Sequence, residues 1–359
     1  MLNIPTIAGN TFRQTATSGQ FWLIVFVGVF ALTVLRYIPF FTFKEDVKMF
    51  KDVGCALILT LTLVQVLMAA SRVIDEEFEN RTAVTLLSKP VRDYELLLGK
   101  FLGVLGAAFA AIALMSIAFE IAVYWRLWDD DYARRRGTIK RQAELDAECW
   151  LNVWTMLPCL VLVMLQTTVM TAVATALSTR LPLVPNMLCC VLLFVVGHLT
   201  PLFTSWTEYE LDAAAFQTLR NEGVSEQVLA KLEPVRNRRF ADEAELSERL
   251  DKALLLTEND RHKARILELA AGWAARSPVR RAGVHILMVV LPDLERAYNV
   301  IDAVAYQQVL TGNAERVPDK VLLGDVWMFT LSSAVYTVAY TAFVLLLGLA
   351  MLRRREVTI

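Results

Sequence analysis

The sequence has few of the residues that build metal sites, disulfide frameworks or catalytic triads. It holds three histidines and five cysteines, and it contains no Cys-X-X-Cys pair and no cysteine–histidine cluster. Four of the five cysteines lie inside apolar blocks, which is not the spacing of a disulfide framework. The sequence therefore predicts neither a bound metal ion nor a catalytic site in this chain.

The sequence also has no nucleotide-binding loop and no large net charge. The pattern GxxxxGK[ST], whose backbone amides cradle phosphates, does not occur, because Gly99-Lys100 is followed by Phe101 and lacks the upstream glycine. The formal net charge of −1 gives no electrostatic argument for nucleic-acid binding. We expect no ATPase activity, no cofactor and no nucleic-acid partner for this chain.

Apolar residues are in excess. They make up 56% of the chain and charged residues 20%, against about 45–50% and about 25% in soluble domains. The excess gathers in six blocks of about 18 to 27 residues, each long enough to cross a membrane as a helix. The predicted spans are 21–43, 53–70, 101–125, 151–177, 181–203 and 326–352. The polar start of the chain lacks the features of a secretory signal, so we expect the first block to stay as an anchor.

Charges near the spans do not decide how the chain is oriented. Lysines and arginines in the short loops divide evenly between the two sides, so the positive-inside rule leaves the orientation open. Lys51 falls in the predicted loop before the second span. Arg36 and Glu120 fall near the outer ends of the first and third spans, where long side chains are expected to reach water.

A charged insertion separates the last two predicted spans. Apolar residues recur at helical spacing in 209–219, 224–232, 246–256 and 266–273, which predicts a small helical domain. His262 and His285 have no partner pattern, so we expect a solvated cap and not a catalytic domain. The stretch 283–291 is too short to cross and is predicted to be interfacial or packed on another helix. The expected parts are 1–203 with five helices, the insertion 204–323, and 324–359 with the last helix and tail.

The segment 72–100 joins the second and third predicted spans and has the pattern of two short amphipathic helices. Pro90 suits the first turn of a helix, and Ser88 lies near its capping position. Apolar surface comes from Leu86, Leu87, Val91 and Tyr94, and charge from Glu76, Glu77, Glu79, Arg81 and Arg92. Such helices can lie along a membrane surface or dock into a groove on a partner, and the pattern leaves both open.

The same segment resembles a known family. The residues Glu77, Thr82, Leu86-Leu87-Ser88-Lys89-Pro90-Val91 and Leu97-Leu98-Gly99-Lys100 resemble the cytoplasmic gate and coupling segment of ABC-2 type transporter permeases, especially the subgroup linked to multi-copper enzyme and nitrous-oxide reductase maturation. Residues 8–13 resemble that subgroup's opening segment, and 291–299 its stretch before the last span. The chain departs at Arg81, where the family often has glycine, and 205–281 has no counterpart.

The resemblance implies an all-α polytopic membrane protein with six transmembrane helices, a cytoplasmic coupling segment and a helical extracytoplasmic insertion. It implies a permease subunit in the inner membrane, with both termini cytoplasmic, that exports an unidentified substrate. ATP and Mg would be bound by a separate cytoplasmic ABC ATP-binding subunit. The implied contact with that subunit consists of Glu76, Glu77, Glu79, Arg81, Thr82, Leu86, Leu87, Lys89, Pro90 and Arg92.

Small residues mark one face of the predicted third span. Gly99, Gly103, Ala107 and Ala111 recur at intervals of four, and such a face lets two helix backbones approach closely. The face can pack inside the bundle or join two subunits, since permeases of this kind pair as a homodimer or with a related chain.

We expect membrane lipids to surround such a permease. Two other classes of function stay open besides it. One is a membrane-anchored binding or assembly protein that works through the insertion. The other is an ion-coupled secondary transporter, for which we would expect paired charges at mid-span and broken helices in an internal repeat.

Overall fold

The structure is a computed structural model that describes residues 3–38, 46–79, 92–134, 142–211, 213–221, 229, 232, 235, 239–240, 243–254, 260–272, 275, 277–292, 294 and 323–356. It divides into two compact units. The helix bundle comprises Met1–Phe194 and Arg296–Ile359, and the insertion unit comprises Val195–Glu295. The boundary between the units falls inside helix α7.

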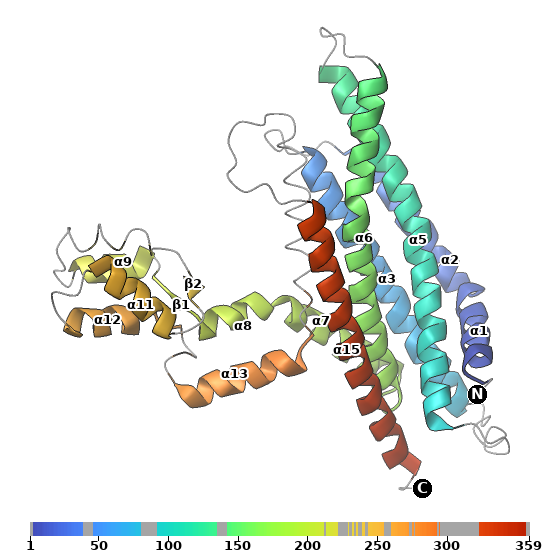
Figure 1. The fold of residues 1–359 in the computed structure, drawn as a ribbon. Helices are drawn as coiled ribbons and strands as arrows, with labels where there is room; N and C mark the ends of the chain where they lie inside the picture. Colours follow the sequence, from blue (N-terminus) through green and yellow to red (C-terminus); the bar gives the residue numbers. More distant parts are fainter. Residues whose placement is uncertain are drawn as a thin grey trace. The chain divides into compact units, whose positions relative to one another are not determined.

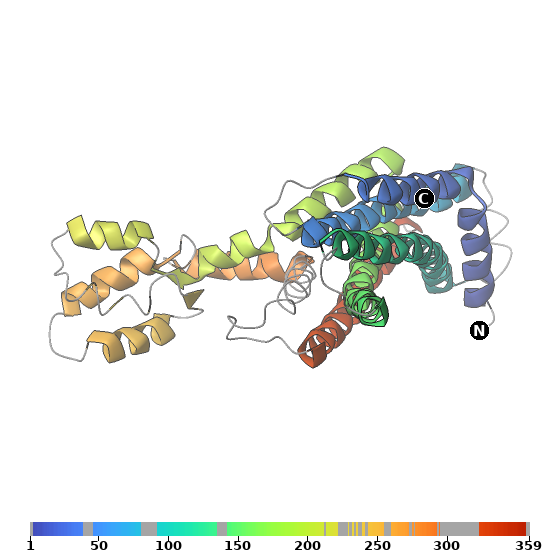
Figure 2. The same cartoon turned by 90° about the horizontal axis from the view of Figure 1, so that it is seen from above.

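Long helices make up the bundle (Figure 1). They are α1 (Asn3–Ala16), α2 (Gly19–Leu35), α3 (Asp46–Glu79), α5 (Asp93–Arg134), α6 (Gln142–Ser178) and α15 (Leu323–Glu356), with the first part of α7 (Leu183–His198). Helix α6 packs against α3, α5 and α15, while α1 and α2 pack against α5. Figure 2 shows α6 between α5 and α15 when the bundle is seen from above. Of the four longest apolar helices, α6 is the most buried and α15 the least.

The apolar helices indicate a multi-pass membrane protein. Among the described residues, four helical stretches are long and apolar enough to cross a membrane: Met49–Arg72, Tyr94–Arg126, Met156–Ser178 and Trp327–Leu352. They coincide with the second, third, fourth and sixth predicted spans. The pair Ile4–Ala16 and Gly19–Leu35, bent by 60°, becomes a fifth if it is counted as one span. The helical multi-pass architecture is confirmed, while six crossings and an outer insertion stay predictions.

The fifth predicted span is not one helix. Helix α7 has 16 residues, which gives a length of about 24 Å against a hydrocarbon layer of about 30 Å. A separate helix, α8 (Thr200–Thr207), follows it. Pro201 has no amide hydrogen and so cannot donate to the Gly197 carbonyl oxygen in α7, which instead accepts a hydrogen bond from the Thr200 hydroxyl at 2.8 Å. The apolar run was continuous in the sequence, but the proline interrupts the helix.

Helix α1 was not predicted, because the start of the chain reads as polar. One of its faces packs onto α5 at Gly99 and Gly103, and Thr11 and Thr15 are buried. The helix ends at a turn in which the Ser18 hydroxyl accepts a hydrogen bond from the Phe21 amide at 3.2 Å, capping α2. This turn is the elbow between α1 and α2.

Hydroxyl side chains lie on the buried face of α15. Thr330, Ser333, Thr337 and Thr341 are buried and recur at intervals of three or four, which places them on one face of the helix. Further along α15, a Cβ added to Gly348 would lie 2.9 Å from the Ala176 Cβ on α6. Small side chains on both helices therefore allow close approach, as expected for helices that associate within lipid.

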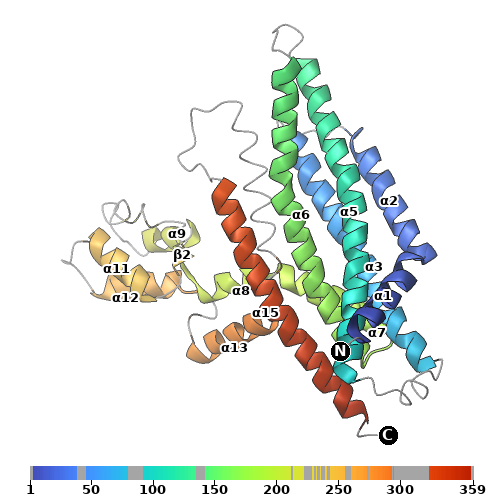
Figure 3. The same ribbon diagram turned by 45° about the vertical axis from the view of Figure 1, so that its right-hand side comes forward.

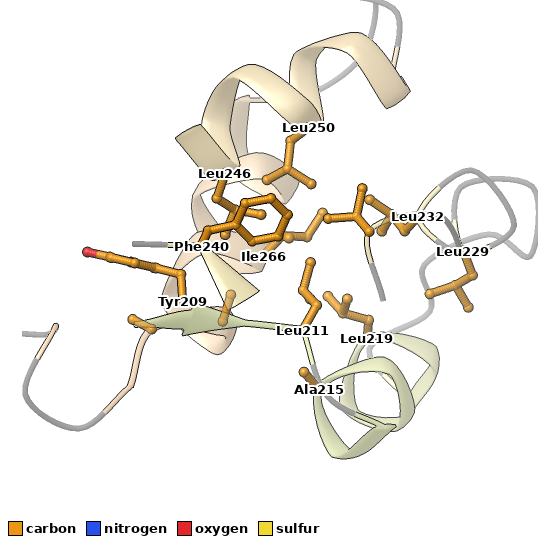
Figure 4. Packing of buried hydrophobic residues seen from close by; sticks show 13 residues of the cluster. Tyr209, Leu211, Ala215, Leu219, Leu229, Leu232, Phe240, Leu246, Leu250 and Ile266 are labelled. Carbon is orange, nitrogen blue, oxygen red and sulfur yellow. The ribbon is translucent and has the colours of Figure 1, made fainter. Parts of the chain in front are cut away.

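The insertion unit has its own apolar core. It contains α8, β1 (Tyr209–Glu210), α9 (Ala213–Asn221), β2 (Arg239–Phe240), α11 (Glu243–Leu254), α12 (Asp260–Ala270) and α13 (Pro278–Val290). The two strands pair antiparallel, with Tyr209 opposite Phe240. Figure 4 shows Phe240 beside Leu246, Leu250 and Ile266, and these side chains belong to one buried cluster. The cluster gives this segment an independent hydrophobic core.

The helical expectation for this segment holds at α9, α11 and α12. The two-residue strands were not predicted, since two residues are too few to show alternation. Most of 224–232 lies outside the described residues. The stretch 283–291 belongs largely to α13, which begins after Ser277 with Pro278 in its first turn and packs against α8.

Replacing Gly103 with alanine is expected to destabilise the bundle. The added Cβ would lie 2.5 Å from the Thr11 Cβ and 2.8 Å from the Ala8 carbonyl oxygen, so α1 must move away from α5. We expect a loss of about 1–3 kcal/mol in the free energy of unfolding, seen as a lower melting temperature in detergent. The matched control is Gly9→Ala, where nothing lies within 4 Å of the added Cβ. That change should be neutral or stabilising by up to about 1 kcal/mol. Equal effects of the two changes would contradict the packing described.

Candidate functional site

One end of the bundle brings together both chain termini and the predicted coupling segment. Figure 3 shows the N and C termini at the same end. Helix α1 packs on the start of α5, and Gly348 near the end of α15 lies against Ala176 and Leu97. Arg180, just after α6, donates from Nε at 3.0 Å and from Nη2 at 2.6 Å to the Met351 carbonyl oxygen. We call this the terminal end of the bundle.

The predicted coupling residues lie at the terminal end or beyond the described chain. Glu76, Glu77 and Glu79 form the last turn of α3, and their backbone is helical. Arg92 directly precedes α5. Arg81, Thr82, Leu86, Leu87, Lys89 and Pro90 lie outside the described residues, so their contacts stay a prediction.

The two short helices predicted for segment 72–100 are extensions of the spans, as far as the chain is described. Residues up to Glu79 continue α3 beyond the apolar stretch that ends at Arg72. Helix α5 starts at Asp93 and continues without a break through its own apolar stretch. The segment between them is therefore joined directly to two neighbouring spanning helices, which pack against each other.

Arg92 sets the start of α5. Its carbonyl oxygen accepts hydrogen bonds from the amides of Glu95 at 2.9 Å and Leu96 at 3.2 Å. Its Nη1 donates to the Tyr94 hydroxyl oxygen at 3.2 Å, and this bond raises the pKa of the exposed guanidinium. A permanent positive charge therefore stands at the surface beside the predicted coupling segment.

The small-residue face of α5 packs within the chain. A Cβ at Gly99 would lie 2.7 Å from the Ile7 Cβ, and Gly103 meets Ala8 and Thr11, so α1 covers both glycines. Ala107 and Ala111 are fully buried. Of the two alternatives for this face, packing inside the bundle is what the structure shows. A subunit contact through Gly99 and Gly103 would require α1 to leave α5.

Asn186 ties three helices together at the terminal end. Its Nδ2 donates to the Ser71 hydroxyl oxygen on α3 at 2.8 Å and to the Ala174 carbonyl oxygen on α6 at 3.2 Å, while the residue itself belongs to α7. The side chain is fully buried, so these bonds replace those it would make with water. No sequence motif pointed to Asn186, because its partners are more than ten residues away in the chain.

Buried charges lie at the other end of the bundle, contrary to expectation. Lys51 belongs to α3 and is 1% exposed, so it is not a loop residue. Both carboxylate oxygens of Glu120 on α5 are buried without a hydrogen-bond partner, so Glu120 does not reach water. The two charges attract each other across the α3–α5 contact. The expectation failed because α3 begins earlier, and α5 ends later, than the apolar blocks.

Arg36 and Arg126 link the end of α2 to α5 at the same end of the bundle. Arg126 Nη1 donates to the carbonyl oxygens of Arg36 and Ile38, the latter at 3.4 Å. The Arg36 guanidinium lies 5.6 Å from the centre of the Trp125 ring, within range of a cation–π interaction. Arginine and tryptophan thus meet where α2 ends and α5 leaves its apolar stretch, as expected at a membrane–water boundary.

Comparisons with known proteins add no family to this arrangement. No protein-family model matches the sequence, and the search of curated proteins finds no match. Within the described part of the chain, no group of three or more histidine, cysteine, aspartate or glutamate side chains could hold a metal ion. The functional interpretation therefore rests on where the described residues lie.

Removing the Lys51 charge is expected to destabilise the bundle more than removing both charges. Lys51→Met leaves the Glu120 carboxylate buried without the positive charge that attracts it, which costs about 3–5 kcal/mol in the free energy of unfolding. Adding Glu120→Gln to the same chain removes the uncompensated charge and should recover most of the loss. Thermal unfolding of both variants measures the difference. A double variant no more stable than Lys51→Met would show that the two charges are not coupled.

Proposed function

We propose that the chain is the membrane-embedded permease subunit of an ABC-2 type transporter, driven by ATP that a separate subunit hydrolyses. One observation carries the proposal. Helices α3 and α5 pack against each other and both run without a break into segment 80–92, at the end of the bundle where both chain termini lie. A partner that moves this segment would act directly on two spanning helices.

The terminal end is built to transmit such a movement. Helix α1 is packed on Gly99 and Gly103, so it moves with the start of α5. Asn186 links α3 to α6 through Ser71 and Ala174, and Arg180 links the end of α6 to α15. Displacement of α3 or α5 at this end would therefore reach the other long helices through the buried bonds of Asn186, the exposed bonds of Arg180 and close packing.

The energy source in this proposal lies outside the chain, since its sequence has no phosphate-binding loop. The proposed partner is a cytoplasmic ATP-binding subunit that carries ATP and Mg. It would contact Glu76, Glu77 and Glu79 at the end of α3, Arg92 at the start of α5, and the segment between them. Both chain termini would then be cytoplasmic and the insertion unit extracytoplasmic.

Pairing of two permease subunits is also part of the proposal. Helix α15 is the least buried of the long apolar helices, and it exposes Met328, Leu331, Val335 and Val338. This apolar surface suits lipid or a second permease chain. The substrate is not named by any residue, and export is the direction that the family resemblance implies.

Reversing the charge of α3's last turn tests the coupling. We expect Glu77→Lys with Glu79→Lys to reduce ATP-dependent transport at least tenfold and to weaken copurification of the ATP-binding subunit, because opposite charge would face the partner. The matched control is Glu144→Lys with Glu148→Lys, in the first turns of α6 at the opposite end. Membrane insertion should be normal in both variants. Full transport in the Glu77 and Glu79 variant would overturn the assigned contact.

Side-specific labelling tests the orientation. In a variant without native cysteines, a cysteine at Ser88 should react with a membrane-impermeant maleimide only from the cytoplasmic side. A cysteine at Thr138, between α5 and α6, should react only from outside. The reversed pattern would place the proposed coupling segment beyond reach of any cytoplasmic ATPase and reject the proposal.

One observation favours an ion-coupled secondary transporter as the second candidate. Lys51 and Glu120 are charges held inside the helix bundle, and charges in such places often belong to ion pathways. Transport driven by an imposed ion gradient in vesicles without ATP, and lost in Glu120→Gln, would favour this candidate over the permease. Transport that requires ATP and the copurified subunit would exclude it.

A further inference from the structure

A cavity lined by both polar and apolar side chains lies at the elbow between α1 and α2. About 70 Å³ of it is open to the centres of water-sized molecules, and helix α3 closes one side. The elbow contributes Thr15, Ser18 and Gln20 to the lining, and α3 contributes Gln65 and Arg72. A water needs about 10–15 Å³ on this measure, so the cavity has room for a small polyatomic group.

Two buried polar side chains in the cavity wall lack a partner. Gln65 is 2% exposed, and neither its Nε2 nor its Oε1 makes a hydrogen bond. Thr15 is 7% exposed, and its Oγ1 also has no hydrogen-bond partner. Buried polar groups are nearly always hydrogen-bonded, because a buried donor or acceptor without a partner has lost its hydrogen bonds to water. The cavity therefore presents an amide and a hydroxyl that a ligand can satisfy.

The charge of the lining residues favours a negatively charged ligand. Arg72 provides a guanidinium, and the described lining residues include no carboxylate. The cavity also meets the start of α2 at Ser18 and Gln20, where the helix dipole is positive and the first backbone amides point away from the helix. A guanidinium, an amide, a hydroxyl and a helix N-terminus are the donors that bind phosphate.

The cavity lies where the apolar stretches of α2 and α3 meet more polar segments of the chain. Arg72 ends the apolar stretch of α3, and α2 exposes Trp22, Leu23 and Phe26 directly after the elbow. Tryptophan and arginine at the end of apolar helices mark the level of lipid headgroups. A phosphate at this level is supplied most directly by the membrane itself.

We propose that the elbow cavity binds the phosphate group of an anionic phospholipid. Arg72, the Gln65 amide and the Thr15 hydroxyl donate to the phosphate oxygens, with the first turn of α2 adding its positive end. The bound headgroup holds α1 and α2 against α3. This site does not depend on the proposed ATPase contact, since none of these side chains belongs to that contact.

Lipid retention by the intact chain tests the proposal. The full-length protein is purified in mild detergent, exposed to phosphatidylglycerol or phosphatidylcholine, and examined by native mass spectrometry. We expect wild type to retain phosphatidylglycerol in preference to phosphatidylcholine. Arg72→Gln and Gln65→Met should each lower the apparent affinity for phosphatidylglycerol about tenfold, the effect of losing one charge-assisted hydrogen bond. Excess inorganic phosphate distinguishes the sources: displacement of the lipid shows that phosphate alone suffices, and retention shows that the lipid chains contribute.

The controls separate a specific site from general attraction and from misfolding. Arg13→Gln removes an exposed arginine on α1 that does not line the cavity, and it should leave lipid retention unchanged. In lipid-free detergent, Gln65→Met should melt at or above the temperature of wild type, because it removes a buried amide without a partner. Equal retention in wild type, Arg72→Gln and Gln65→Met would overturn the site. An equal loss in Arg13→Gln would do the same, since it would show unspecific charge attraction.

Discussion

Helices inside a bilayer gain little by burying apolar side chains against one another, because the surrounding lipid is as apolar as they are. Their association depends on how closely the backbones approach and on hydrogen bonds between them. In this chain the close approaches occur at small residues on α3, α5 and α15: Gly54 against Phe119, Gly103 against α1, and Gly348 against Ala176. Hydroxyl-bearing residues line the buried face of α15, and Asn186 joins α3, α6 and α7.

The position of α1 follows from the same constraint and shapes the terminal end. The two glycines of α5 leave a groove that Ile7 and Thr11 fill, which holds a short amphipathic helix against a spanning one. With α1 held there, the chain must turn through 60° to enter α2, and the elbow cavity lies at this turn. The proposed coupling contact and the proposed phosphate site are therefore neighbours, because one packing interaction organises both.

Long apolar runs were predictable from the sequence, and features that depend on a few residues were not. Four spans coincide with predicted blocks, since 20 or so apolar residues have few alternatives to a spanning helix. Helix α1 was missed because the buried residues on it are threonines, which carry no hydropathy signal. The glycines that it packs against, Gly99 and Gly103, lie far away in the sequence. The break between α7 and α8 and the burial of Lys51 were missed because hydropathy ignores backbone geometry and helix ends. For the candidate site, sequence pattern marked the segment between α3 and α5, but Asn186 and the elbow cavity arise only from packing between distant parts of the chain.

Helices α5 and α6 are longer than the apolar stretches that they contain. Beyond Arg126, α5 continues to Arg134 for about 12 Å, and α6 begins at Gln142, about 21 Å before its apolar stretch starts at Met156. Apart from the groups in the terminal turns, the backbone hydrogen bonds of both extensions are made within each helix, so the extensions can stay helical in water. A molecule that docks on these helical extensions would therefore meet protein without displacing lipid.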